Sequence, residues 1–230
     1  MQHKGWSFYA MLSIIGGVCF IPSQSFVFAQ GSISDPPFLT PGSNHYGKPY
    51  EEWASSWWQW HISLPSSVNP KNVDVHTCPV FTNGNVSFLD HSEEGKTEVT
   101  CNIPANTAVF TTILSGECDS DEMKTMAEAP ILECAKEGGD FSESAIMLDN
   151  VQLKNYESRI TTKFFNITIP EDNVYMVNPG TFKAVVDGYF LFLKPLPIGE
   201  HNLNIKVDVK DPSDPNFTSG YDATLKLIVN

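Results

Sequence analysis

The sequence predicts a mainly β protein, a β-sandwich of jelly-roll or immunoglobulin-like type with a tryptophan-rich helix near its start. Short apolar segments recur at regular spacing from about residue 78 onward, and Asn-Gly, Asp-Gly and proline turns separate them. Residues 50–64 differ abruptly, because aromatic residues recur there at helical spacing. We therefore expect a signal peptide at 1–29, an extended arm at 30–49 and a single β-rich domain at 50–230.

The first 29 residues have the order of a secretory signal. A basic start with Lys4 precedes an apolar stretch from Gly5 to Ile21, and Val27-Phe28-Ala29 offers small or β-branched residues for a peptidase. The alternative is a retained N-terminal membrane anchor, although the apolar run is short for a bilayer and contains glycines. The sequence therefore predicts a secreted or extracytoplasmic protein, cleaved after about Ala29.

Residues 30–49 are rich in Gly, Ser, Pro and Asn and predict an extended arm. Residues 50–64 form the best helix of the chain, which Pro65 ends. On a helical wheel Trp53, Trp57 and Trp60 fall with Leu64 on one arc of about 60°. This stripe is expected to pack on a sheet.

Trp58 lies away from that stripe. It either forms a second buried contact or presents its ring to a sugar or a partner protein, since aromatic rings stack on the apolar faces of sugars. Glu51, Glu52 and Gln59 on the same helix would then supply hydrogen bonds. These four residues are the candidate binding site.

Turn signals divide the rest of the chain into strands. Asn83-Gly84, Asp149-Asn150 and Asp187-Gly188 each predict a hairpin. Residues 120–137 are expected to be helical, kinked or split by Pro130. The expected strands are 79–81, 85–89, 97–103, 108–114, 145–148, 151–153, 159–169, 182–186, 189–193, 201–209 and 223–229.

Removal of Cys19 with the signal leaves an even set of four cysteines, Cys78, Cys101, Cys118 and Cys134. In an exported chain such a set predicts disulfides, and three pairings are possible. We prefer the local pairs Cys78–Cys101 and Cys118–Cys134. A zinc site is the competing interpretation, but it would need closer cysteine pairs than these.

The chain is acidic, with 14 Lys and Arg against 27 Asp and Glu and a net charge of −13. Such a surface repels nucleic acid and anionic membranes, so neither is an expected partner. An extracellular glycan or a cell-surface protein is compatible with it. Asn85, Asn166 and Asn216 each begin an N-glycosylation sequon, which would be used only in a host that glycosylates exported proteins.

No motif of a known catalytic or metal site is present, so we nominate no catalytic residue and expect no cofactor. The weak metal-ligand candidates are His61, His76, His91 and His201. The segment from Asp90 to Glu94 is dense in potential ligands, but it is more simply a solvated hairpin loop. His61 is expected to be a packed or capping residue at the border of the tryptophan stripe.

Two blocks of sequence resemble a family of secreted microbial proteins. The first is Tyr46-Gly47-Lys48-Pro49-Tyr50-Glu51-Glu52-Trp53 followed by Trp57-Trp58-Gln59-Trp60, and the second runs from Val186-Asp187-Gly188-Tyr189 to Glu200-His201. The cysteine segments around Cys78, Cys101 and Cys118 also take part in the resemblance. It implies one secreted unit with the four cysteines as a set, and it implies no activity.

Together these observations favour an exported, non-catalytic binding or cell-surface structural module, with a carbohydrate as the most concrete ligand. The alternative function is a secreted hydrolase or metal-dependent enzyme that uses the histidines with nearby acids. A third possibility is a partner within a surface layer or matrix.

Overall fold

The computed structural model describes residues 36–72, 76–137, 142–156, 159–211 and 214–230, without the side chains of 142, 210–211 and 214–218. The expected signal peptide and the first residues of the arm lie outside this part of the chain. Residues from Asp35 onward form one compact unit. None of the helices in the described ranges is long and apolar enough to cross a membrane.

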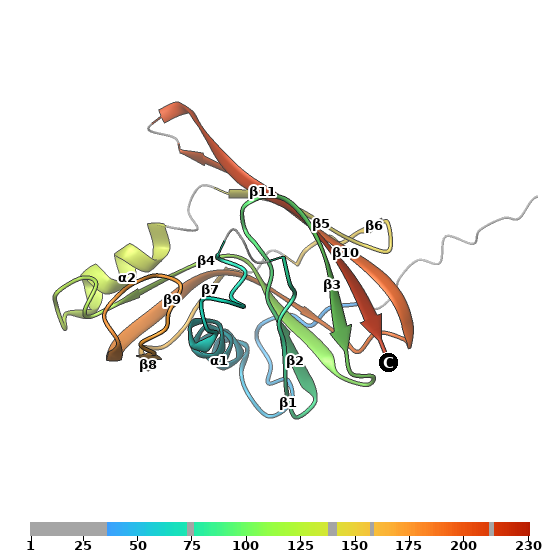
Figure 1. Ribbon diagram of the computed structural model, residues 1–230, viewed down its shortest axis with the longest axis horizontal. Helices are drawn as coiled ribbons and strands as arrows, with labels where there is room; N and C mark the ends of the chain where they lie inside the picture. Colours follow the sequence, from blue (N-terminus) through green and yellow to red (C-terminus); the bar gives the residue numbers. More distant parts are fainter. Residues whose placement is uncertain (1–35, 73–75, 138–141, 157–158, 212–213) are drawn as a thin grey trace, which may run out of the picture. The chain divides into compact units, whose positions relative to one another are not determined.

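The fold is a β-sandwich, which confirms the predicted fold class (Figure 1). The larger sheet has the order β1-β2-β4-β9-β7, with β8 also paired to β9, and the smaller sheet has the order β3-β11-β10-β5-β6. Pairing is antiparallel except between β2 and β4 and between β3 and β11. The strands of the larger sheet are β1 (Val80–Asn83), β2 (Val86–Leu89), β4 (Ala108–Asp119), β7 (Arg159–Thr161), β8 (Phe165–Ile169) and β9 (Gly180–Leu193). Those of the smaller sheet are β3 (Gly95–Ile103), β5 (Ser142–Leu148), β6 (Val151–Gln152), β10 (Gly199–Asp211) and β11 (Asp214–Val229).

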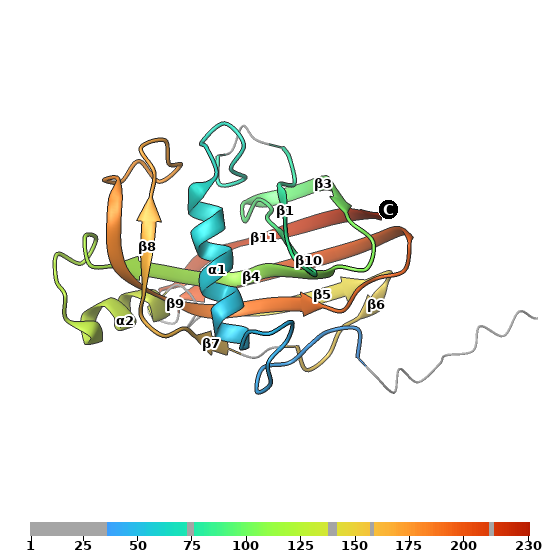
Figure 2. The ribbon, with the colours of Figure 1, turned by 90° about the horizontal axis from the view of Figure 1, so that it is seen from below.

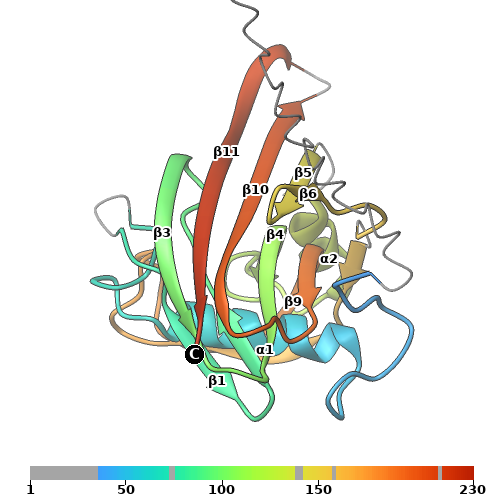
Figure 3. The same ribbon diagram turned by 90° about the vertical axis from the view of Figure 1, so that its right-hand side faces the viewer.

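The main core lies between the two sheets, where alternate residues of facing strands are buried. Ile113 and Leu191 of the larger sheet share this core with Ile205 and Leu225 of the smaller one. The hairpin of β10 and β11 is longer than its neighbours and extends past β3 and β5 (Figure 3).

The tryptophan-rich helix α1 (Tyr50–Ser63) lies across the outer face of the larger sheet (Figure 2). Trp53 and Trp57 are buried there against aromatic residues of the strands, and Trp60 is half-buried. The indole N–H of Trp57 donates to the carbonyl of Leu89 at 2.9 Å. The predicted stripe therefore does pack on a sheet, and α1 adds a third layer to the sandwich.

The second helix is shorter than predicted. α2 (Glu128–Glu137) begins eight residues late, because Asp119 organises residues 120–124 into a turn instead. The Oδ1 atom of Asp119 accepts hydrogen bonds from the backbone N–H groups of Asp121 and Glu122. Pro130 then falls in the first turn of α2, where a missing N–H group breaks no hydrogen bond.

The predicted hairpin at Asp187-Gly188 is wrong, since both residues lie in the middle of the single strand β9. A Cβ atom on Gly188 would stand 2.4 Å from the carbonyl oxygen of Leu114, so glycine permits β4 to approach closely. Asp187 is buried because it pairs with Arg159 and accepts a hydrogen bond from Thr161. Residues 159–169 are likewise not one strand but two, β7 and β8, and both pair with β9.

Both preferred disulfides are confirmed. Cys78 and Cys101 have Cα atoms 5.2 Å apart and tie the segment before β1 to β3 of the other sheet. Cys118 and Cys134, at 6.0 Å, tie β4 to α2. The bridges therefore fasten one sheet to the other and α2 to the sandwich.

Candidate functional site

A β-bulge in β4 determines which residues of that strand face α1. Before the bulge, Phe110 packs among the buried aromatic residues that lie between the larger sheet and α1. The register with β9 then slips between Thr112 and Leu114, which shifts the alternation of side chains by one residue. Ser115 and Glu117 consequently lie on the α1 side of the sheet. Without the slip in register, the residues next to them in β4 would lie there instead.

Ser115 holds Trp58 in place. The indole N–H of Trp58 donates to the Ser115 hydroxyl at 3.0 Å, and this hydroxyl is 3.1 Å from that of Thr112. Only 8% of Trp58 is exposed. An exposed ring that stacks on a sugar at the protein surface is therefore not what the structure shows, because β4 covers the indole.

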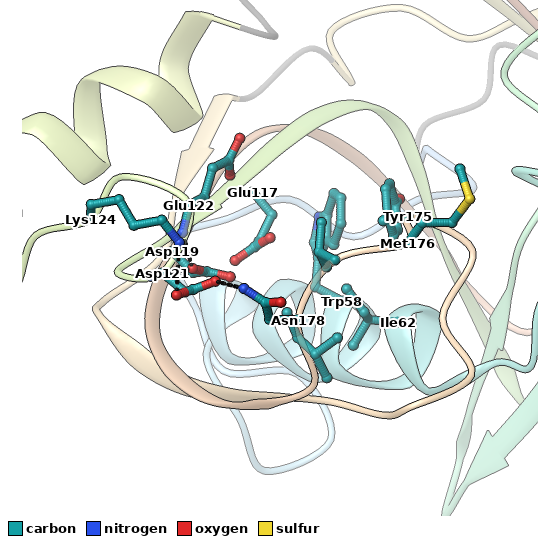
Figure 4. Close-up of a pocket in the computed structure, with 12 residues that line it drawn as sticks. Trp58, Ile62, Glu117, Asp119, Asp121, Glu122, Lys124, Tyr175, Met176 and Asn178 are labelled. Carbon is teal, nitrogen blue, oxygen red and sulfur yellow. Dashed lines mark hydrogen bonds and ion pairs between the residues drawn. The ribbon is translucent and has the colours of Figure 1, made fainter.

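Beside Trp58 lies a cavity of about 450 Å³, which we call the Trp58 cavity (Figure 4). Side chains from α1, the end of β4, the turn at 120–124, the end of β8 and the loop before β9 line it. One wall is aromatic and aliphatic and the other is acidic. The lining residues are Trp58, Ile62, Glu117, Asp119, Asp121, Glu122, Lys124, Ile169, Tyr175, Met176, Val177 and Asn178.

Glu117 is the most unusual group of the cavity. Its Oε1 atom is shielded from solvent and has no hydrogen-bond partner among the described residues. Burial, together with the nearby charges of Asp119 and Glu122, raises the pKa of the Glu117 carboxyl to about 8. At neutral pH this carboxyl is therefore mostly protonated. In Figure 4 it points into the space between the acidic turn and Trp58.

The other acids of the cavity have partners or reach water. Asp121 accepts hydrogen bonds from Lys124 at 3.0 Å and from Asn178 at 3.0 Å, which lowers its pKa. Glu122 is exposed, and partial desolvation and Asp119 raise its pKa. Carboxylates outnumber the one cation, Lys124, in the lining, so the electrostatic potential of the cavity is negative.

The loop between β8 and β9 forms the rim of the cavity. The Asn173 side chain fixes this loop, since its amide group donates to the carbonyls of Pro170 and Val177 and its oxygen accepts the Val177 N–H. Met176 has a positive φ of 55° and is 92% exposed, although it carries an apolar side chain. An apolar residue held in this conformation at a cavity rim is typical of a functional loop rather than of a core.

Tyr175 connects the cavity to a buried polar cluster behind it, which we call the Asp90 cluster: His61, Asp90, His91 and Tyr175. Nδ1 of His61 lies 2.7 Å from Oδ2 of Asp90, and Nε2 of His61 lies 2.7 Å from the Tyr175 hydroxyl. With the Nδ1 proton donated to Asp90, a neutral ring accepts from Tyr175 at Nε2. The His61 ring also stacks on Trp57, with the planes 10° apart.

The segment that follows β2 is thus not the solvated hairpin loop expected from its sequence. Asp90 and His91 are each only 2% exposed, because the chain crosses here from one sheet to the other. Burial lowers the pKa of His91 to about 4, and its Nδ1 atom has no partner among the described groups. Burial, with the charge of Asp90, raises the pKa of Glu93 to about 7.

The four residues of the predicted binding site do not converge. Trp58 alone lines the cavity, while Glu51 and Glu52 lie in the first turn of α1. The Gln59 side chain is engaged with β8, where its amide group donates to the carbonyl of Thr168 and its oxygen accepts the Thr168 N–H. It therefore extends the hydrogen-bonding edge of a strand instead of facing a ligand.

The metal-ligand candidates are dispersed as well. His61 and His91 belong to the Asp90 cluster, His201 pairs with Asp149 at 2.7 Å on the other sheet, and His76 is exposed before β1. In the part of the chain that the structure describes, three potential ligand atoms meet at Cys118, Glu122 and Cys134. Both of these sulfur atoms are bonded to each other, so they offer no thiolate to a metal ion.

Of the three sequons, Asn85 and Asn166 have exposed side chains, and the side chain of Asn216 lies outside the described ones. Sequence reasoning missed Glu117, Asp119 and Tyr175. The signal for Asp119 was its position before a turn, but nothing in the residue order locates the β4 bulge that aims Glu117 at the helix.

No protein-family model matches the sequence, and no curated protein does. Among solved structures, the solution structure of amebosin is similar over 60% of this chain and 98% of its own, with 10% identity and a TM-score of 0.18. A likeness this slight carries no inference about fold or function.

Proposed function

We propose that the protein is an exported, non-catalytic binding module that takes a small molecule into the Trp58 cavity. The observation that carries the proposal is the pairing of an apolar, aromatic wall with the Glu117 carboxyl, one oxygen of which has no hydrogen-bond partner among the described residues, within a space large enough for a ligand. Binding sites are typically such concave, largely apolar spaces with a few polar groups. Export is supported by the two disulfides, which are typical of oxidising compartments.

A binding role agrees with the chemistry of the groups around the cavity. Burial and the charges of Glu93 and Asp90 raise the pKa of Tyr175 well above its usual value, so its phenol stays protonated. A protonated phenol that donates to His61 is a poor nucleophile but can still accept a hydrogen bond from a ligand.

Tryptophan fluorescence tests the proposal directly. We expect a saturable change when the intact protein is titrated with a panel of sugars, alcohols, amines and amino acids. The change should persist in Trp60→Phe, whose ring lies outside the cavity, and be lost in Trp58→Phe. The carbohydrate expected from the sequence is tested in the same panel. An absence of saturable binding by every class would overturn the proposal.

One observation favours the alternative function, a secreted hydrolase. Asp90, His61 and Tyr175 form a hydrogen-bonded chain that ends at the cavity wall, and such a chain can orient a general base. Turnover of model esters, glycosides or peptides that is present in the native protein and abolished in His61→Gln, but kept in His201→Gln, would establish it.

A further inference from the structure

We infer that the ligand of the Trp58 cavity is an organic cation, a primary ammonium group on an apolar body, whose ammonium group binds the carboxyl group of Glu117. The inference rests on the proposed function and names the ligand class. The cavity has an apolar wall and an acidic wall, which match the apolar body and the positive charge of one such molecule.

The apolar wall suits the body of such a ligand. Trp58, Ile62 and Ile169 offer aromatic and aliphatic surface, and Met176 and Val177 stand at the rim. An indole ring also attracts an ammonium group through its π-electrons, most strongly where water is excluded. The Ser115 hydrogen bond fixes the indole, so little conformational freedom is lost when a ligand binds.

The acidic wall suits the charge. Three groups lie near Glu117: the carboxylates of Asp119 at the end of β4 and Glu122 in the turn after it, and the phenol of Tyr175 in the β8–β9 loop. Asp121 is occupied by Lys124 and Asn178. An anionic ligand would meet like charges here, whereas the net negative charge of the lining attracts a cation.

The carboxyl group of Glu117 decides between a cation and other hydrogen-bond donors. A buried polar atom without a partner is rare, so the Glu117 carboxyl at the cavity wall has hydrogen-bonding capacity that the described residues do not use. A neighbouring positive charge favours the ionised carboxyl, so binding removes the proton that burial retains on Glu117. Binding is therefore an exchange: the ammonium group enters and one proton leaves to solvent.

The matched probes are hexylammonium and hexan-1-ol, which share a body and differ in charge. We expect the ammonium compound to bind at least about tenfold more tightly at pH 7. Calorimetry in buffers of different ionisation enthalpy should report a release of nearly one proton for each ligand. The affinity for hexylammonium should rise from pH 6 to pH 8 and then level off. Above its pKa of about 8, Glu117 is already deprotonated in the ligand-free protein, so binding no longer releases a proton.

Glu117→Gln is the decisive variant, since glutamine imitates the protonated carboxyl. It should fold normally, lose the preference for ammonium and release no proton. Glu98→Gln, an exposed acid of β3 outside the cavity, should behave as the native protein does. Urea unfolding of each variant confirms that the fold is intact.

The outcomes separate the two proposals. If hexan-1-ol or a sugar binds as well as hexylammonium, or if Glu117→Gln keeps the preference, the cavity is a binding site but the cation inference is overturned. If neither these probes nor any member of the wider panel binds, both proposals fail.

Discussion

The hydroxyl group of Tyr175 lies 2.7 Å from Nε2 of His61, and this hydrogen bond joins the buried Asp90–His61 pair to the wall of the Trp58 cavity. The contact bridges 114 residues of sequence. It fixes the rim loop of the cavity to α1 and to the crossing between the sheets. The candidate site and the Asp90 cluster are therefore one connected structure.

Removing His61 should destabilise the fold strongly. Asp90 is only 2% exposed, and in His61→Gln its buried carboxylate loses the hydrogen bond that the His61 ring donates from Nδ1. We expect the free energy of unfolding to fall by about 3 kcal/mol, measured by urea denaturation. The surface pair of His201 and Asp149 is the control, and His201→Gln should cost less than about 1 kcal/mol. Equal costs for the two variants would contradict the role assigned to the Asp90 cluster.

Glu117 should make the protein less stable as the pH rises. Its pKa is about 8 in the folded state and about 4.3 in an unfolded chain, so between these values only the folded state holds the proton. Its contribution to the free energy of unfolding then falls by as much as about 1.4 kcal/mol per pH unit. Glu117→Gln removes that loss, so its stability relative to the native protein should increase from pH 5 to pH 8. A difference that stays constant with pH, as expected for Glu98→Gln, would show that Glu117 is not the buried acid described.

The contact between β4 and β9 depends on Gly188. In Gly188→Ala the new Cβ atom would stand 2.4 Å from the backbone of Leu114 and Ser115, and the strands would have to separate. We expect a loss of more than about 3 kcal/mol in thermal or urea unfolding. Gly84 is the control, because it has a positive φ, as Gly188 does, but no atom lies within 4 Å of the position of an added Cβ. Gly84→Ala should therefore cost about 1 kcal/mol. A cost for Gly188→Ala no larger than that of the control would refute the close approach.

The disulfides should each stabilise the native fold. Each closes a loop of the size for which the chain-entropy model gives about 3 kcal/mol. Without reductant the intact mass should lie four hydrogens below the all-thiol value, and peptide mapping should recover the two local pairs. Replacing Cys78 and Cys101 together by serine should lower the unfolding free energy by about 3 kcal/mol. Free thiols or crossed pairs in the native protein would contradict the assignment.

Much of the local structure could be predicted from the residues because it depends on short-range chemistry. The stripe of Trp53, Trp57 and Trp60 follows from helical geometry, and the Asn83-Gly84 hairpin follows from the backbone freedom of glycine. The pairing of the cysteines was also correct, because local closures were preferred among three alternatives. Each of these depends on residues close together in the chain.

The errors share one cause, which is contact between distant segments. Asp187-Gly188 has the composition of a turn, yet Arg159 neutralises the acid and β4 occupies the space beside the glycine, so the strand continues. Asp90 and His91 have the composition of a solvated loop, yet they are buried because His61 and Tyr221 lie within hydrogen-bonding reach. Local composition cannot reveal a partner that lies many residues away.

The sequence by itself determined the class of fold, the helix that packs on it and the cysteine framework, since hydrophobic period, turn chemistry and cysteine spacing are properties of neighbouring residues. Only the tertiary structure decided where a ligand site lies. The bulge in β4 reverses the alternation of side chains and brings Glu117 beneath α1, and the loop after β8 closes the space with Tyr175 and Met176. That site depends on one slipped register between two strands, which no property of the residues around Glu117 indicates.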